Sequence, residues 1–286
     1  VEVVSEGLPV FDAPQVTSLD LCGLAWPSVL PSLPRMPELR VVRHELGDDM
    51  LPGDELVLDE SQARPFVGAM ARGTWRSISV FSVESPLPLE FCIAAADSWR
   101  ELRELHFCLK CALPSTVCRY MLIHLPLLET LWVSIRSEPD EVDSAVDKHA
   151  IDADEALASL KLADPFTVPA LKTWTLSFAE DRCFDGLRFP ALTSLKIMGA
   201  SGAFRRVDDV LSRMPALQSL RVEMDPRAKP APLTASGDAS LPCFLALRII
   251  AFLHVPSPAN LCSRWRRARP ICNGSNSTRV TVSTAK

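Results

Sequence analysis

Cysteine is the residue type in this chain whose spacing could support chemistry. Cys108 and Cys111 are separated by two residues in the segment "CLKC", and Cys118 follows nearby. Such a pair can form half of a zinc site or a dithiol redox centre. A zinc site needs a second pair at a matching spacing, and none follows. We therefore expect Cys108 and Cys111 to lie at the end of a short strand, without a bound metal.

Other motifs for catalysis and cofactor binding are missing from the sequence. It contains no glycine-rich phosphate loop, no G-x-S-x-G nucleophile elbow and no H-E-x-x-H zinc motif. The five histidines are dispersed along the chain. We expect no cofactor and no enzymatic activity, so the function must be sought in a binding surface.

Composition is typical of a globular protein. Hydrophobic residues make up 48% of the 286 residues, which is ample for a core. The net charge of −5 argues against a general nucleic-acid-binding protein. No apolar run approaches the ~18 to 20 residues of a membrane span, and no signal segment begins the chain. Nine scattered cysteines fit reduced thiols. We expect a cytoplasmic or nuclear location, binding of neither nucleic acid nor membranes, and a chain that is a fragment, because it begins at Val1.

A short pattern recurs along the chain and predicts the elements that would build a binding surface. It is a proline followed by three apolar residues at intervals of two, three and two positions, as in "PALTSLKI". Two further units lack the proline, Trp75/Ile78/Val80 and Leu102/Leu105/Phe107, and a weaker unit has His44 at its last apolar position. Units with the proline begin at Pro14, Pro37, Pro126, Pro169, Pro190, Pro215 and Pro242.

The spacing of these units is that of a leucine-rich repeat. Six of the eight steps from one unit to the next are 21 to 27 residues long, within the range of about 20 to 29 residues known for such repeats. The alternative is an ordinary α/β domain whose leucines align by chance. Residues at alternate positions share one face of a strand, so each unit needs neighbours to bury its apolar face.

The fold class that follows is α/β, a leucine-rich-repeat solenoid with a curved parallel sheet on the concave side and helices with irregular loops on the convex side. We expect helices in the segments that start at Ser61, Val117 and Arg205. The expected strands are 16–22, 76–81, 103–108, 129–134, 172–177, 193–198, 218–223 and 245–250.

From Val10 to Val255, these "PxLxxLxL" units resemble the leucine-rich-repeat region of F-box proteins, particularly the divergent fungal type. The resemblance implies protein recognition and, with an F-box upstream, a Skp-type adaptor and a cullin-type ubiquitin ligase. The family's Asn or Cys three residues after the last strand leucine is missing, and Val1–Leu8 is too short to hold an F-box.

Two segments depart from the repeat. Residues 137–165 are acidic, with a predicted helix at Ile151–Leu162, and read either as a plain insertion or as an acidic docking or autoinhibitory segment. We place the repeat domain, of about nine irregular units, at residues 1–255. Residues 256–286 are basic and expected to be a disordered tail, with a nuclear-import signal or a cap as alternatives.

The residues that would face a partner follow from the alternation of side chains along a strand. They lie between the buried positions of each unit, and the basic ones gather toward the C-terminal end. We interpret this column as a docking strip for an acidic or phosphorylated protein segment, with Trp132 as an apolar anchor; the alternative is ordinary solvated charge. The expected column is Asp20, Arg43, Ser79, His106, Trp132, Thr175, Lys196, Arg221 and Arg248, and the expected partner-binding residues are Arg43, His106, Trp132, Lys196, Arg221 and Arg248.

The function that the sequence favours is protein–protein recognition by the concave face of the repeats, as the substrate-recognition part of an F-box protein. Two alternatives stay open at this point. The chain could be the non-catalytic region of a larger repeat-bearing enzyme, or a secreted or surface recognition protein. An F-box, a catalytic domain or a signal peptide upstream would separate the three.

Overall fold

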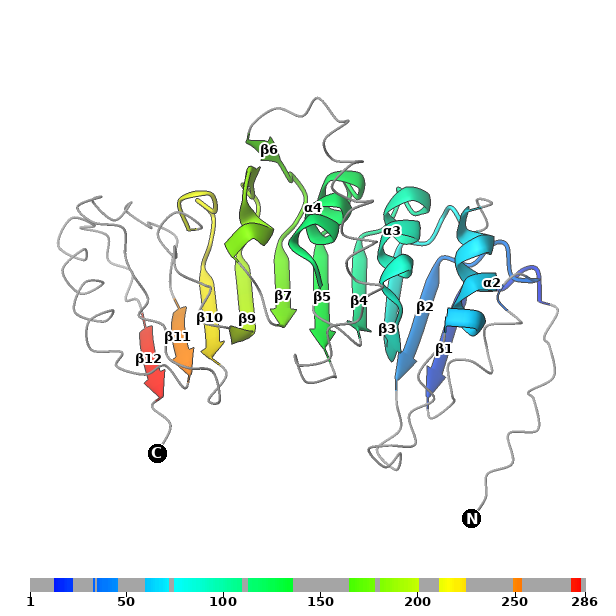
Figure 1. Cartoon of the computed structure of the whole chain (residues 1–286), viewed down its shortest axis with the longest axis horizontal. Helices are drawn as coiled ribbons and strands as arrows, with labels where there is room; N and C mark the ends of the chain where they lie inside the picture. Colours follow the sequence, from blue (N-terminus) through cyan, green and yellow to red (C-terminus); the bar gives the residue numbers. More distant parts are fainter. Residues whose placement is uncertain are drawn as a thin grey trace, which may run out of the picture.

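The protein is a mixed α/β structure built on one long parallel sheet (Figure 1). We describe it from a computed structural model. The residues that the structure describes are 13–22, 33, 35–45, 60–71, 75–109, 113–135, 165–177, 181–200, 211–224, 249–253 and 279–283.

The long sheet has ten strands, and each pairs in parallel with its neighbour in the row. The two edge strands, β1 and β12, lie at opposite ends of the row (Figure 1). The predicted parallel pairing is therefore confirmed. In row order the strands are β1 Ser18–Cys22, β2 Val41–Glu45, β3 Val80–Leu87, β4 Glu104–Leu109, β5 Thr130–Ile135, β7 Thr173–Ser177, β9 Ser194–Ala200, β10 Ser219–Met224, β11 Ile249–Leu253 and β12 Arg279–Ser283.

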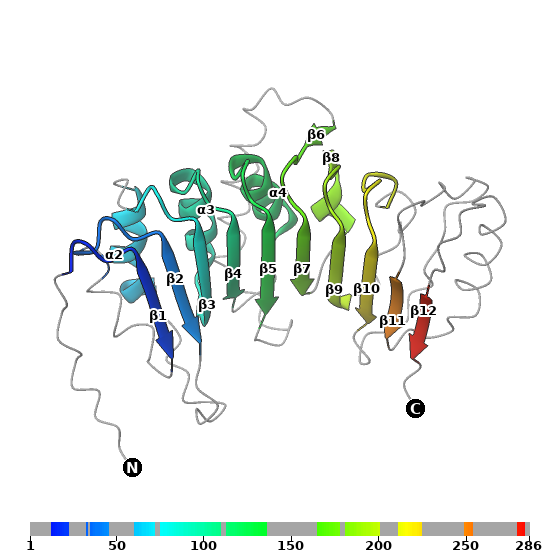
Figure 2. The same cartoon turned by 180° about the vertical axis from the view of Figure 1, so that it is seen from behind.

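The helices of the described residues lie on one face of this sheet, and the other face is open to the viewer in Figure 2. They are α2 Glu60–Ala71, α3 Leu89–Ser98 and α4 Ser115–His124. The predictions from Ser61 and Val117 are confirmed by α2 and α4. The helix predicted from Arg205 falls outside the described residues until Leu211, and α3 was not predicted.

A repeated turn leads into most strands. Leu128 donates its backbone N–H to the Leu125 carbonyl at 3.2 Å, and the same i to i+3 bond recurs before β1, β2, β3, β4, β9 and β10. In five of these turns the second residue is the proline of the repeat, and this is a position that proline favours. The proline thus belongs to the turn before the strand and not to the strand's first residue. The five prolines are Pro14, Pro37, Pro126, Pro190 and Pro215.

A ladder of backbone hydrogen bonds then passes from each unit to the next. The Glu129 carbonyl accepts the N–H groups of both Lys172 and Thr173, at 2.8 and 3.1 Å. In the long sheet, the same double acceptance fixes each strand from β2 to β10 against its preceding neighbour in the row. We call the acceptors the ladder carbonyls; they belong to Thr17, Arg40, Ser79, Arg103, Glu129, Lys172 and Thr193.

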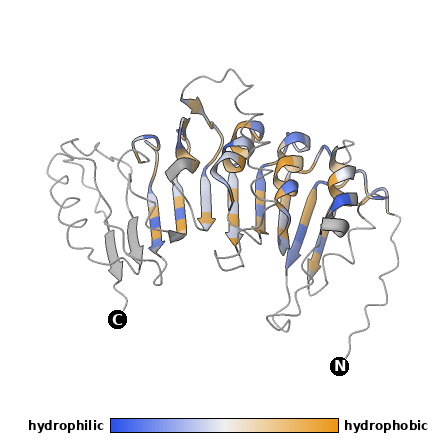
Figure 3. Ribbon diagram, in the orientation of Figure 1, coloured by the Kyte–Doolittle hydropathy of each residue, from blue (hydrophilic) through white to orange (hydrophobic). Residues whose placement is uncertain are grey.

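The core lies between the sheet and the helices. Alternate strand residues turn toward the helices and are buried, and Figure 3 shows the alternation of hydrophobic and hydrophilic residues along the strands. Phe91 of α3 lies at the centre of an aromatic cluster, with ring centroids 5.0 Å from Phe81 and 5.6 Å from Trp99. One inward row contains Phe81, Leu105, Leu131, Trp174, Leu195 and Leu220, and the next contains Val83, Phe107, Val133, Leu176, Ile197 and Val222.

Two predicted registers are wrong by three residues. In the third unit Phe81 pairs with Leu105 and Val83 with Phe107, so the inward residues are Ile78, Phe81 and Val83. Trp75, predicted as the first apolar residue of that unit, instead lies in the preceding turn at a φ of 62°, where its indole N–H donates to the Leu33 carbonyl at 3.0 Å.

The last predicted unit is displaced in the same way. Leu220 pairs with Ile250 and not with Leu247, which lies outside the described residues. The C-terminal segment also differs from the prediction of a disordered tail, because β12 lies within it and pairs with β11. The acidic segment 137–165 lies outside the described residues except for Pro165. Beyond it, β6 Phe166–Thr167 and β8 Leu187–Arg188 form a small second sheet, and the 3-10 helix η2 Asp181–Phe184 comes just before β8.

Candidate functional site

The open face of the sheet carries one row of side chains that cross it strand by strand. We call this row the central column. It contains most of the predicted residues, in the predicted order along the sheet. Its members are Asp20, Arg43, Ser82, His106, Trp132, Thr175, Lys196 and Arg221, and the backbone register continues at Ala251 and Thr281.

The structure places five of the six predicted partner-binding residues in this column and displaces the sixth. Arg248 lies outside the described residues, and the residue paired with Arg221 is Ala251. Ser82 likewise takes the place predicted for Ser79. Both corrections follow from the register difference of three residues. The residues confirmed in the column are Arg43, His106, Trp132, Lys196 and Arg221.

At the N-terminal end of the column the charges are paired with each other. The Arg43 guanidinium lies 3.6 Å from the Asp20 carboxylate, its neighbour on the next strand. Both side chains are largely exposed, so the pair adds little to stability. It does leave this end of the column without net charge.

The middle of the column is aromatic. Trp132 is 45% exposed, one of two large hydrophobic residues that are so exposed among those described. His106 on the neighbouring strand meets it edge-on, with ring centroids 5.5 Å apart. Burial lowers the pKa of His106, with Glu104 raising it and Arg43 lowering it further. His106 is therefore uncharged at neutral pH, and the surface around Trp132 suits an apolar side chain.

The C-terminal end of the column is cationic. Lys196 and Arg221 lie directly opposite each other on β9 and β10. Arg221 lies 3.6 Å from Glu223 of its own strand. Within the described residues no carboxylate lies at ion-pair distance from Lys196. Like charges on adjacent strands repel, so this end of the column would be stabilised by an external anion.

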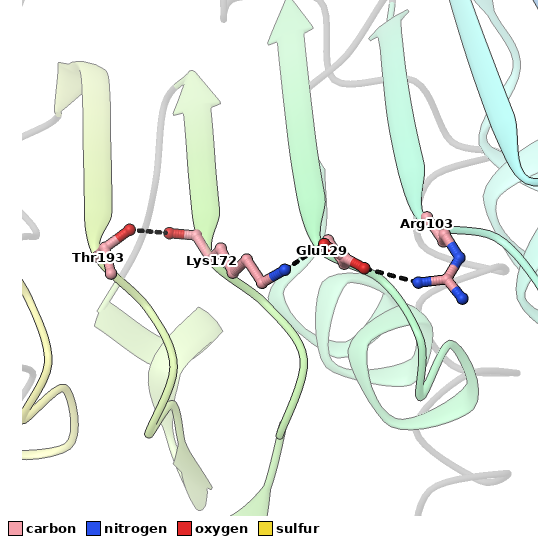
Figure 4. A network of polar contacts seen from close by, with 4 residues as sticks. All are labelled: Arg103, Glu129, Lys172 and Thr193. Atoms are coloured by element: carbon pink, nitrogen blue, oxygen red, sulfur yellow. Dashed lines mark hydrogen bonds and ion pairs between the residues drawn. The ribbon is translucent and has the colours of Figure 1, made fainter.

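A polar network crosses the sheet where β4, β5 and β7 begin (Figure 4). Glu129 accepts a hydrogen bond from Arg103 at 2.7 Å and a second one from Lys172. The Thr193 hydroxyl continues the line by donating to the Lys172 carbonyl at 3.1 Å. The bonds from Lys172 and from Arg103 hold the pKa of the Glu129 carboxyl below its ordinary value. One carboxylate thus pairs with two cations, and the network keeps one net positive charge beside the middle of the column.

Sequence reasoning missed this network, and it also missed a row of hydroxyls. The hydroxyl row lies two residues before the central column, on the same face, and its members are adjacent in register. A sequence signal for both existed. In each unit concerned, the network residue comes three positions before the central-column residue, and the hydroxyl residue comes two positions before it. The hydroxyl row consists of Thr130, Thr173, Ser194 and Ser219.

The cysteines have no chemistry of their own in the described part of the chain. Cys108 is buried in β4 and forms no disulfide, and Cys111 lies outside the described residues. A hydrogen bond with Cys183, followed by burial, raises the pKa of the Cys118 thiol, which makes it a poor nucleophile. In the ranges that the structure describes, no three histidine, cysteine or acidic side chains are arranged to hold a metal ion.

An open hollow of about 850 Å³ lies beside β6 and β8. Arg188, Arg213 and Asp185 contribute its charged groups. Arg213 already donates to the Phe184 carbonyl at 2.7 Å, and Asp185 supplies a negative charge beside the two arginines. The lining of the hollow thus combines charges of both signs and, unlike the central column, includes no aromatic side chain.

Comparison of the chain with protein-family models, with curated proteins and with solved structures finds no match. Among the helices of the described residues, none is long and apolar enough to cross a bilayer. The site must therefore be interpreted from its own geometry and charge.

Proposed function

We propose that this chain is a leucine-rich-repeat recognition region that binds a protein partner through the central column. In this proposal it is the substrate-recognition part of an F-box protein, which reaches a Skp-type adaptor and a cullin-type ubiquitin ligase through an F-box upstream. The observation that carries the proposal is the exposed Trp132 on an open sheet face, two strands from the cationic pair Lys196 and Arg221.

The repeated turns and the ladder carbonyls support the repeat assignment. A solenoid stacks units that contact only their neighbours, and every strand of the long sheet pairs with the next strand along it. Repeats of this kind commonly bind partners on the surface formed by their strands. The same face here lacks a covering helix among the described residues and carries the central column (Figure 2).

The charge of the column supports an acidic partner segment. The whole chain has a net charge of −5, whereas the C-terminal end of the column is positive. A negatively charged segment thus gains more at this place than on the rest of the surface. Trp132 supplies the kind of large, rigid anchor that dominates binding energy at interfaces.

The test is capture of partners by two double variants with the same change in charge. Lys196→Glu with Arg221→Glu should abolish capture of the partners that the wild type retains from cell extract. Arg266→Glu with Arg267→Glu, in the C-terminal segment, should leave capture intact. Wild-type capture should also weaken as salt rises, because exposed charges are screened over about 8 to 10 Å near physiological ionic strength.

The opposite pattern would place recognition in the C-terminal segment and overturn the proposal. Far-ultraviolet circular dichroism of both double variants checks that each is folded. The ligase assignment has a separate test, the coding sequence upstream of Val1. An F-box there would support it, whereas a catalytic domain or a signal peptide would replace it with one of the alternatives.

A further inference from the structure

The cationic end of the column is also the end that is richest in small hydroxyl side chains. Ser194 and Ser219 lie two residues before Lys196 and Arg221 on the same face, and the two serines are paired in register. Thr175 precedes Lys196 in the central column. All three hydroxyl residues are partly exposed. Two cations and several hydroxyl donors therefore converge on one patch of β7, β9 and β10.

This combination fits a phosphoryl group better than a carboxylate. The pair Lys196 and Arg221 lies on strands about 4.8 Å apart, so one ligand can contact both. A phosphorylated serine or threonine carries about −1.5 to −2 charges and three acceptor oxygens at neutral pH, whereas a carboxylate carries one charge and two oxygens. With its larger charge and three acceptor oxygens, the phosphoryl group can contact Lys196, compete with Glu223 for Arg221 and still accept hydrogen bonds from the hydroxyls.

The same column also fixes the distance from this patch to the aromatic anchor. From Trp132 the strands run β5, β7, β9 and β10, so Lys196 is two strands away and Arg221 is three. At about 4.8 Å per strand, the centre of the cationic pair lies about 12 Å from Trp132. An extended peptide advances about 3.3 Å per residue and its side chains alternate between two faces, so a spacing of four residues covers this distance with both side chains toward the sheet. Thr175, the small residue between them, leaves the path across β7 open.

We propose that the occupant of the central column is an extended protein segment with a phosphoserine or phosphothreonine between Lys196 and Arg221 and an apolar side chain, four residues away, on Trp132. This inference rests on the proposed function and specifies its ligand. The segment crosses the strands, and the neutral His106 adds to the apolar surface at the Trp132 end.

The experiment is fluorescence anisotropy with the full chain and synthetic peptides. Each peptide has one phosphoserine in a background of alanine, serine and glycine, and one leucine placed one to seven residues away on either side. Binding should be tightest with the leucine four residues away, by about tenfold over the shortest and longest spacings. Replacing phosphoserine with serine or aspartate at the best spacing should weaken binding by at least about tenfold.

Matched variants assign each end of the peptide. Trp132→Ala should remove the preference for spacing and keep the preference for phosphate. Lys196→Gln with Arg221→Gln should remove the preference for phosphate and keep the preference for spacing. Arg43→Gln, in the same column but paired with Asp20, should change neither. Circular dichroism and thermal unfolding confirm that each variant is folded.

Three results would overturn the inference: no dependence on spacing, equal binding of the aspartate and phosphoserine peptides, or a spacing preference that survives Trp132→Ala. The proposed function has a different failure. If partners from extract need Lys196 and Arg221 while no phosphopeptide binds, the phosphopeptide inference falls and the recognition surface stands. If neither partners nor peptides depend on these two residues, both fall.

Discussion

At the scale of single residues, His106 shows how the open face separates an aromatic surface from a charged one. Burial is the main cause of its lowered pKa, Glu104 acts against it, and Arg43 acts with it. The imidazole beside Trp132 is consequently neutral at the pH at which Lys196 and Arg221 are charged. A partner therefore meets two chemically different ends of one column.

The lowered pKa of His106 predicts a loss of stability at acid pH. In the unfolded chain the pKa returns to about 6.5, so the unfolded state takes up the proton first as pH falls. The contribution of neutral His106 to the unfolding free energy is complete above the pKa of the unfolded state. It is lost as pH falls through the lower pKa of the folded state. Urea unfolding of the wild type and of His106→Gln at pH 7.5, 6.5 and 5.5 measures how much unfolding free energy is lost as pH falls. The variant should lose less of its unfolding free energy between these values, and identical pH profiles would contradict the prediction.

Inward and outward residues of one strand should respond differently to truncation. Leu195 and Leu220 are buried and stack on each other, whereas Ser194 and Ser219 precede them on the open face. Each leucine-to-alanine change should cost about 2 to 5 kcal/mol of unfolding free energy, and each serine-to-alanine change should cost less than about 0.5 kcal/mol. Chemical unfolding of the four variants decides it, and equal effects would mean that the two faces are assigned wrongly.

At the scale of elements, the sequence predicted which segments form strands better than it predicted which residues of each strand face inward. Ile78 is the second apolar residue of Trp75/Ile78/Val80 and also the first of Ile78/Phe81/Val83, and both triplets satisfy the repeat pattern. Only the pairing of Phe81 with Leu105 decides between them. Leu247 creates the same ambiguity in the last unit. Because one apolar residue can be either the first or the second of a unit, the pattern alone does not decide which residues face inward. The positions of Ser79 and Arg248 were mispredicted for this reason.

Helix α3 escaped prediction because it has almost no polar face. Its residues Leu89, Phe91, Cys92 and Ala94–Ala96 are all buried, since it packs between the sheet and its neighbouring helices α2 and α4. Amphipathic periodicity, the main sequence signal for a helix, is weak in such a segment. The helices α2 and α4 keep a more polar side and were found. Contacts with other elements, which the sequence does not display, determine the buried helix.

The aromatic cluster around α3 should be the most sensitive part of the core. Phe91 is 1% exposed and contacts Phe66, Phe81, Trp99 and Phe107. Phe91→Ala should cost about 3 to 5 kcal/mol. Ile93→Ala, on the same helix but only partly buried, should cost clearly less. Denaturant unfolding compares the two variants, and a larger loss for Ile93 would show that the cluster is not central to stability.

At the scale of the whole molecule, the long sheet is a row whose end strands, among the described residues, are β1 and β12. Burial at the first strand is incomplete, since Leu19 and Leu21 are only partly buried, whereas their counterparts in β5, Leu131 and Val133, are fully buried. Each unit contacts mainly its neighbours, so stability is a sum along the row. An end strand has one such neighbour and a middle strand has two.

Hydrogen exchange should reveal this gradient. Amides of β5 and β7 should exchange more slowly than those of β1, because local opening at an end breaks contacts on one side only. Mass spectrometry of peptic fragments under native conditions gives the comparison. Equal protection in β1 and β5 would show that the row opens as one cooperative unit.

The ladder carbonyls show that the groups which hold the strands in place differ from the groups that a partner would contact. Each strand is fixed to the previous one by main-chain groups, which every residue type except proline can supply. Outward side chains add to that task where the strands begin, as Thr193 does by donating to the Lys172 carbonyl, but the residues of the central column take no part in these hydrogen bonds. The residues of the central column can therefore change while the sheet stays the same. A different set of residues in the central column would give a chain of the same shape a different target.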